Sequence, residues 1–140
     1  MLLRLALALS LSVSLVHACD CIDVGAGESK RGADIVFRGT VTGFRDSVKG
    51  DRLVVFRVNR VWKGTIKQSF EMLALESGHA CFGFGHGFLR VGNELLVFGS
   101  TFGSDKIQEF PYLSMHCATK LAKDAKDIQQ LGRGRNPKPM

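Results

Sequence analysis

Two runs of apolar and β-branched residues near the start of the folded region are typical of β-strands. Asp34–Phe44 (DIVFRGTVTGF) is interrupted by Gly39 and Gly43, which predicts a bent or bulged strand. Leu53–Trp62 (LVVFRVNRVW) shows partial alternation of apolar and polar positions. Because the segment between the two runs is polar and turn-rich, we expect them to form a hairpin. A third strand is expected over Ile66–Leu75.

The second half of the chain predicts further extended segments. The glycine-rich segment Glu76–Gly87 (ESGHACFGFGHG) has no periodic apolar pattern, so we expect a loop there. Beyond it, Phe88–Val91 and Glu94–Thr101 flank a Gly-Asn turn and predict a second hairpin. Lys106–Met115 supplies a last extended piece, and the proline within it favours an edge position. The runs together predict five or six short strands.

The apolar spacing changes from Ala118 onward. Apolar side chains at helical spacing predict an amphipathic helix that ends at Gly132. They are Leu121, Ala125, Ile128 and Leu131. Residues 132–140 (GRGRNPKPM) are typical of a disordered basic tail. Strands followed by one helix predict a mainly β fold, a small closed barrel with the helix packed on it, and a sheet sandwich is the competing arrangement.

Residues 1–18 (MLLRLALALSLSVSLVHA) have the features of a secretory signal peptide. Arg4 precedes an apolar run over Leu5–Val16, and the small Ala18 stands before Cys19. The run is too short for a membrane helix, which needs roughly 20 residues, and no later segment is a better candidate for a transmembrane span. We therefore expect a secreted protein, extracellular or periplasmic, with a single domain over residues 19–131.

The chain carries 19 basic and 13 acidic residues. On an exported protein, a modest basic balance suggests polyanionic surface polymers as partners, and it is equally compatible with simple solubility. Nothing in the sequence argues for sequence-specific nucleic-acid binding.

All four cysteines follow the expected leader, and an oxidising compartment favours disulfides. They are Cys19, Cys21, Cys81 and Cys117. Of the three pairings that four cysteines allow, the one that joins Cys19 to Cys21 is disfavoured, because the loop between them is strained. Both remaining pairings tie the start of the mature chain to two distant points, so we expect a clamped N-terminus.

Several short motifs together resemble the N-terminal domain of the tissue inhibitors of metalloproteinases, which is a netrin-like module. They are CDC at residues 19–21, GADIVFRGTV, VWKG, LESGHACF and ELLVFGS, with a late cysteine before the C-terminal segment. The resemblance implies an oligonucleotide/oligosaccharide-binding-type (OB-type) barrel. It also implies that Cys19 pairs with Cys81 and Cys21 with Cys117.

The same resemblance implies a function for the clamped end. A catalytic zinc keeps one coordination position open. In the family, the α-amino group and carbonyl oxygen of the first cysteine, here Cys19, occupy that position on the target enzyme. Asp20 would then point toward the enzyme's specificity pocket. Glu76, Ser77 and the residues leading to Cys81 would form a second contact strip. The expected partner is a zinc metalloendopeptidase, with no cofactor bound by this chain.

Three other interpretations use the same residues. Cys19 and Cys21 can be no more than staples in a non-inhibitory binding module for a protein or a polyanion. VHAC also ends like a bacterial lipoprotein signal, in which Cys19 is lipidated. The histidines near the cysteines match no established zinc pattern, and disulfides leave no cysteine nucleophile, so an enzyme is the class least expected.

Overall fold

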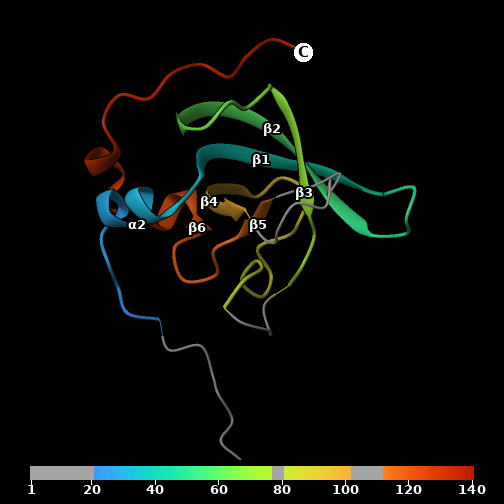
Figure 1. The fold of residues 1–140 in the computed structure, drawn as a ribbon, viewed down its shortest axis with the longest axis horizontal. Coiled ribbons are helices and arrows are strands. Elements are labelled where there is room, and N and C mark those ends of the chain that lie inside the picture. The colour runs from blue at the N-terminus through green and yellow to red at the C-terminus, as the bar shows by residue number, and fades with distance from the viewer. Residues whose placement is uncertain (1–20, 77–80, 102–111) are drawn as a thin grey trace, which may run out of the picture.

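The computed structural model describes residues 21–76, 81–101 and 112–140. Over these ranges the protein is mainly β, with one sheet, one α-helix and two short 3-10 helices (Figure 1). The elements are α2 (Ala26–Gly32), β1 (Ile35–Asp46), β2 (Arg52–Lys63), β3 (Ser69–Leu73), β4 (Glu94–Thr101), β5 (Tyr112–Ser114), β6 (Lys120–Leu121), η1 (Ala122–Asp124) and η2 (Ile128–Leu131). None of the helices in these ranges is long and apolar enough to cross a membrane.

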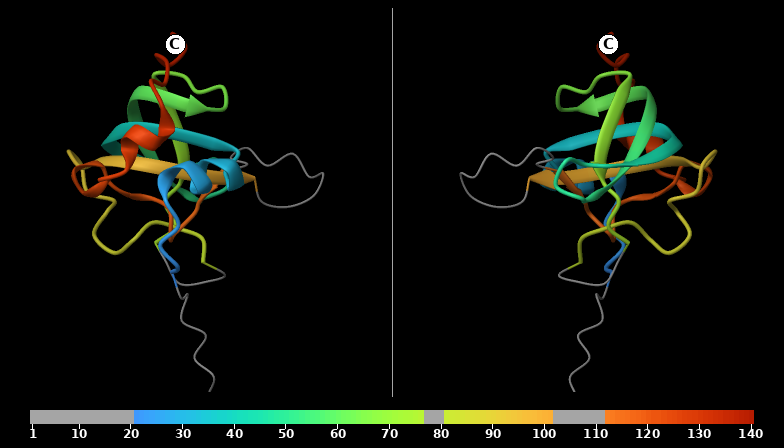
Figure 2. Two further views of the ribbon diagram at one scale, coloured as in Figure 1. Left: turned by 90° about the vertical axis from the view of Figure 1, so that its left-hand side faces the viewer. Right: turned by 90° about the vertical axis from the view of Figure 1, so that its right-hand side faces the viewer.

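The sheet has six strands, all paired antiparallel. Their order is β3-β2-β1-β4-β5, and β6 pairs with β4. The predicted hairpin is formed by β1 and β2, and its register shifts beside Gly39 and again at Gly43. Both strands curve strongly (Figure 2), as expected where a bulge interrupts the regular ladder. The prediction of a bent first strand is therefore confirmed.

The curvature brings the two outer strands of the sheet toward each other. The rings of Phe70 in β3 and Tyr112 in β5 have centroids 6.1 Å apart. Among the described residues, however, no ladder of hydrogen bonds joins β3 to β5. The sheet is curled and its two edges are unpaired with each other.

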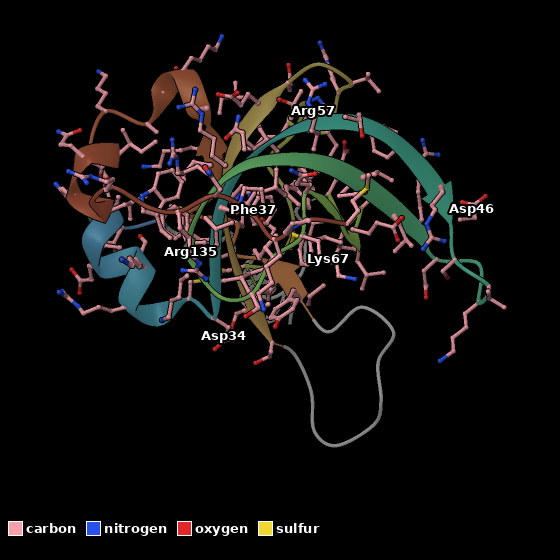
Figure 3. All side chains as sticks on the ribbon, turned by 90° about the horizontal axis from the view of Figure 1, so that it is seen from above. Asp34, Phe37, Asp46, Arg57, Lys67 and Arg135 are labelled. Atoms are coloured by element: carbon pink, nitrogen blue, oxygen red, sulfur yellow. A yellow bond between two sulfur atoms is a disulfide. The ribbon has the colours of Figure 1, made fainter. Side chains whose placement is uncertain are left out.

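Side chains alternate between two hydrophobic cores on opposite faces of the sheet. In β1, Ile35 and Phe37 are buried in an inner core that the curled sheet encloses (Figure 3). Val36 between them is buried in an outer core, which includes Ala26 of α2. Because a strand alternates its side chains between faces, burial on both faces requires an almost continuous apolar run. The segment ELLVF of β4 follows the same rule.

A tight turn follows β2 at Gly64. Its φ of +83° lies in the left-handed region, and a Cβ atom placed there would stand 2.6 Å from Cγ2 of Ile35. Only glycine fits this position without a clash. The third strand then runs over Ser69–Leu73, inside the predicted range Ile66–Leu75.

The predicted second hairpin is only half correct. Glu94–Thr101 is strand β4, but Phe88–Val91 forms turns and no strand. The side chain of Asn93 donates hydrogen bonds to the carbonyl oxygens of Gly87 at 3.2 Å and Phe88 at 3.0 Å. These bonds fold the segment back on itself, so its backbone does not extend along β4.

The predicted amphipathic helix after Ala118 is wrong. Leu121 lies in β6, pairs with Leu95 and packs against the inner core. Ala125 and Leu131 are buried in the outer core, on or beside the two 3-10 helices. The apolar residues at helical spacing therefore serve two cores on opposite faces of the sheet, which one face of a single helix cannot reach.

Helix α2 was not expected from the sequence. Its seven residues include two glycines, and only Ala26 and Ser29 are buried. The backbone N–H of Ala26 donates to Oδ2 of Asp127 at 2.6 Å. A helix this short is marginal in isolation, so α2 depends on contacts with the distant C-terminal segment.

The C-terminal residues 132–140 are ordered against β2, so the expectation of a disordered tail was wrong. Arg135 and Val61 exchange two backbone hydrogen bonds of 2.8 and 2.9 Å. The indole N–H of Trp62 donates to the carbonyl oxygen of Gly132 at 3.0 Å. Hydrogen bonds of backbone groups hold this polar segment in place. The pattern of apolar and polar side chains in the sequence carries no information on such bonds.

Candidate functional site

A disulfide fixes the first described residue of the chain to a point near its end. Cys21 bonds Cys117, with the Cα atoms 5.2 Å apart across a sequence separation of 96 residues. Cys117 lies in a turn after β5, where the N–H of Thr119 donates to the carbonyl oxygen of Met115 at 2.9 Å. This bridge is the one that the resemblance implied for Cys21.

Cys81 lies beside that bridge and is itself disulfide-bonded. Its carbonyl oxygen accepts a hydrogen bond of 3.1 Å from the N–H of His116, the neighbour of Cys117. Its φ of +62° is left-handed, which is uncommon for a residue other than glycine. The expected partner, Cys19, lies outside the described residues. We call the region that holds Cys21, Cys81 and Cys117 the cystine end; it is on the lower side of Figure 1.

Glu76, the first residue of the predicted contact strip, lies in the same region. Glu76 forms a parallel bridge with Phe84, and the N–H of Phe84 donates to the carbonyl oxygen of Leu75 at 2.7 Å. The N–H of Gly83 donates to the carbonyl oxygen of Ser114 at 2.8 Å. The segment 82–84 thus contacts the chain after β3 and the end of β5. Of the predicted site residues, the structure brings Cys21, Cys81 and Glu76 to this end, while Cys19, Asp20 and Ser77 lie outside the described residues.

Gly83 has a specific role in this arrangement. Its φ is +107°, and a Cβ atom there would stand 2.7 Å from the carbonyl oxygen of Leu75. A larger residue would push the segment away from the chain after β3. The high glycine content of this loop, which predicted only irregular structure, here permits close backbone packing.

A mostly apolar cavity of about 400 Å³ opens at the cystine end. Its wall comes from the N-terminal segment, α2 and the residues around two of the cysteines: Ile22, Val24, Glu28, Ser29, Gly32, Cys81, Phe82, Met115, His116, Cys117 and Ala118. Of these, Ile22 is 78% exposed and Val24 is 40% exposed. Exposed apolar side chains grouped at a cavity are typical of a surface that binds another molecule.

Sequence reasoning missed this cavity. It gave no binding role to Ile22, Val24, Phe82 or Met115. The available signal in the sequence was the apolar pair Ile22 and Val24, which follows Cys21 in a short segment with no other apolar pattern.

The histidines do not form a metal centre in the described part of the chain. No group of three or more histidine, cysteine or acidic side chains lies close enough there to hold a metal ion. His116 lines the cavity, and its buried Nδ1 has no hydrogen-bond partner among the described residues.

Electrostatic perturbation is evident at Asp34, at the start of β1. The pKa of Asp34 is lowered, chiefly because its Oδ2 accepts a 2.7 Å hydrogen bond from the backbone N–H of Thr101. The hydroxyl groups of Thr101 and Ser100 donate to the same oxygen at 2.9 and 3.2 Å, and the charge of Lys63 acts in the same direction. These bonds tie the start of β1 to the end of β4, which is a structural role.

No protein-family model matches the chain, and no curated protein matches it either. The resemblance to the metalloproteinase-inhibitor domain therefore rests on the motifs and on the residues gathered at the cystine end.

Proposed function

We propose that this chain is a secreted inhibitor of zinc metalloendopeptidases, in which the α-amino group and carbonyl oxygen of mature Cys19 bind the target's catalytic zinc. The observation that carries the proposal is the clustering of disulfide-bonded Cys21 and Cys81 at one end, with the Cys81 carbonyl bonded to His116 beside Cys117. Cys21 is two residues from the proposed zinc ligand, so its bridge restrains the segment that has to enter the enzyme.

The chemistry of a chain terminus suits this role. An α-amino group has an unperturbed pKa of about 7.7–8.0, so a metal ion readily displaces its proton and binds the neutral nitrogen. A restrained segment loses less conformational entropy on binding than a free one. In the proposal the leader 1–18 directs export to a compartment where disulfides are stable, and its removal creates this terminus.

The fold that accompanies this proposal is a closed OB-type barrel. The approach of Phe70 to Tyr112 supports it. The segment 82–84 supports it further, because it bonds to the carbonyl oxygens of both Leu75 and Ser114 and so spans the gap between the two sheet edges. Closure through this segment would carry the contact strip at Glu76 next to the clamped terminus.

The surface around the terminus has the character of a protein contact. The exposed Ile22 and Val24 line an apolar cavity, and such side chains gain most when a partner removes them from water. In the proposal, Asp20 and Ser77 complete this contact surface, with Asp20 directed into the specificity pocket of the enzyme.

The test compares three purified proteins against a panel of zinc endopeptidases. One is the mature chain beginning at Cys19, the second carries one alanine before Cys19, and the third carries one alanine after Met140 as a matched control. We expect the first and third to inhibit at least one enzyme, and the second to be weaker by about 100-fold or more, because the added residue displaces the amine from the metal. Equal inhibition by all three would contradict zinc binding through Cys19.

The second candidate is a non-inhibitory netrin-like module that binds a protein through the apolar cavity. The cavity and its exposed rim favour this function whether or not the terminus binds a metal. Silence of all three proteins against the panel, together with capture of a defined partner that Ile22→Asp abolishes, would favour the module.

A further inference from the structure

The positive charge of the chain is concentrated in two segments. Residues 52–68 contain five basic and no acidic side chains, and residues 132–140 contain three basic and no acidic ones. The two segments together hold eight of the 19 basic residues. The rest of the chain has 11 basic and 13 acidic residues and is therefore net negative. The net charge of +6 thus arises from β2, the turn after it and the C-terminal segment.

The fold joins these two segments into one surface. The C-terminal segment pairs with β2 at Arg135 and Val61, and with the turn after β2 where Lys138 bridges Lys67. Gly134 lies between η2 and the bridge at Arg135. It is so close to β2 that a Cβ atom on it would stand 2.9 Å from Cδ of Arg60. Residues more than 70 positions apart in sequence, Val61 with Arg135 and Lys67 with Lys138, therefore lie side by side.

We propose that this surface binds a linear anionic polysaccharide. We call it the basic surface, and it consists of Arg57, Arg60, Lys67, Arg133, Arg135 and Lys138. Figure 3 labels Arg57 on β2, Lys67 in the turn after it and Arg135 in the C-terminal segment. All six are exposed except Arg60, which is half-buried.

The charges of the basic surface are available to a ligand. In the described part of the chain, the ion pairs join Arg38 to Glu94, Arg45 to Glu71 and Lys120 to Asp127, and none of them uses a residue of the basic surface. Three other basic side chains are thus neutralised locally, whereas the six of the basic surface have no acidic partner among the described residues. Clustered like charges in water raise the local concentration of an opposite polymer and release its counterions on binding.

A long polymer fits the surface better than a single anion. An extended chain from residue 133 to residue 138 spans roughly 17 Å at about 3.3 Å per residue, and Arg57 and Arg60 extend the charge along β2. One phosphate or sulfate group contacts only two or three of these side chains. A chain with repeated negative charges contacts all of them at once.

Two other polyanions fit less well. A membrane surface calls for apolar side chains that enter the lipid, and Met140 is the only large exposed hydrophobic residue in these two segments. Single-stranded nucleic acid calls for exposed aromatic rings on which bases stack. Trp62 is half-buried, its N–H is bonded to Gly132, and Gly134 covers it at close range.

The basic surface does not depend on the proposed inhibition. It lies with the C-terminus on the upper side of Figures 1 and 2, whereas the described part of the chain begins on the lower side, at the cystine end. A chain with an extra alanine before Cys19 should therefore keep its affinity for the polymer, so failure of one proposal is distinguishable from failure of the other.

The experiment uses two variants of the mature chain with the same net charge. One replaces four residues of the basic surface: Arg57→Gln, Lys67→Gln, Arg133→Gln and Lys138→Gln. The control replaces four exposed basic residues elsewhere: Lys49→Gln, Arg90→Gln, Lys123→Gln and Lys126→Gln. The probes are a sulfated oligosaccharide of defined size and a polyuronate of equal charge, titrated at several salt concentrations. The tryptophan fluorescence and disulfide content of each variant establish that it is folded.

We expect the surface variant to lose affinity by about 30-fold or more at low salt and its salt slope to fall by about one per removed contact, with the control within about threefold of the parent. Preference between the two probes identifies sulfate or carboxylate as the favoured group. The proposal is overturned if both variants lose affinity equally, or if neither does. It is also overturned if anionic vesicles or a single-stranded oligonucleotide bind more tightly than both sugars at equal charge.

Discussion

Removal of the Cys21–Cys117 bridge should cost the protein a large part of its stability. The change is the double substitution Cys21→Ala and Cys117→Ala, which leaves no unpaired thiol from this bridge. A cross-link stabilises mainly by restricting the unfolded chain, and for a separation of 96 residues the loop-closure estimate is about 4.7 kcal/mol.

The second disulfide lowers that figure only slightly. If Cys81 bonds Cys19 as the resemblance implies, the path from Cys21 to Cys117 through that bridge is about 40 residues, and the same relation gives about 3.9 kcal/mol. The expected loss is therefore about 4 kcal/mol, a large share of the roughly 5–15 kcal/mol typical of a single domain.

Urea unfolding followed by the fluorescence of Trp62, the only tryptophan, measures this loss. The matched control is Ser29→Ala, which removes a 3.5 Å hydrogen bond from the Ser29 hydroxyl to the Val24 carbonyl oxygen in the same region. It should cost less than about 1 kcal/mol. A loss below about 1.5 kcal/mol in the double variant would refute the claim that this bridge restrains the unfolded chain.

Three further predictions concern single positions. Gly64→Ala should destabilise by at least about 1 kcal/mol more than Gly50→Ala in urea unfolding, because both have positive φ but open space surrounds only Gly50; equal losses would contradict a steric role. Trp62→Phe should cost about 1 kcal/mol and speed amide exchange in residues 132–138, since the bond to Gly132 is lost; unchanged exchange would argue against this anchor. Asp34→Asn should reduce the loss of folding stability on acidification. The pKa of the Asp34 carboxyl is lowered in the folded state, so the carboxylate stabilises the fold above the unfolded pKa of about 3.9, and this stabilisation is lost as pH falls through the folded pKa. Parallel curves of unfolding free energy against pH for parent and variant would rule this out.

The long strands could be predicted from the sequence because their burial is periodic. β1, β2 and β4 carry apolar side chains into cores on fixed faces, and the predicted ranges match them within two residues at each end. The Cys21–Cys117 pairing followed only from the resemblance, because the residues alone left two pairings open.

The elements that sequence reasoning missed are held by contacts that side-chain patterns do not encode. α2 depends on a hydrogen bond from Ala26 to Asp127, across 101 residues. The helical spacing of Leu121 and Ala125 proved misleading because these residues belong to different cores. The apolar cavity required knowledge of which segments meet at the cystine end.

The pairing of residues 132–140 with β2 has a consequence for the behaviour of the protein in concentrated solution. β3 covers β2 only as far as Arg57, and beyond it the backbone of β2 bonds to Gln68 at Val58 and to Arg135 at Val61. An uncovered strand margin is a template on which a second molecule can add its own strand. Residues 132–140 therefore cover part of the edge of β2 and should oppose self-association. A chain shortened after Leu131 should form dimers or larger aggregates that the full chain does not form.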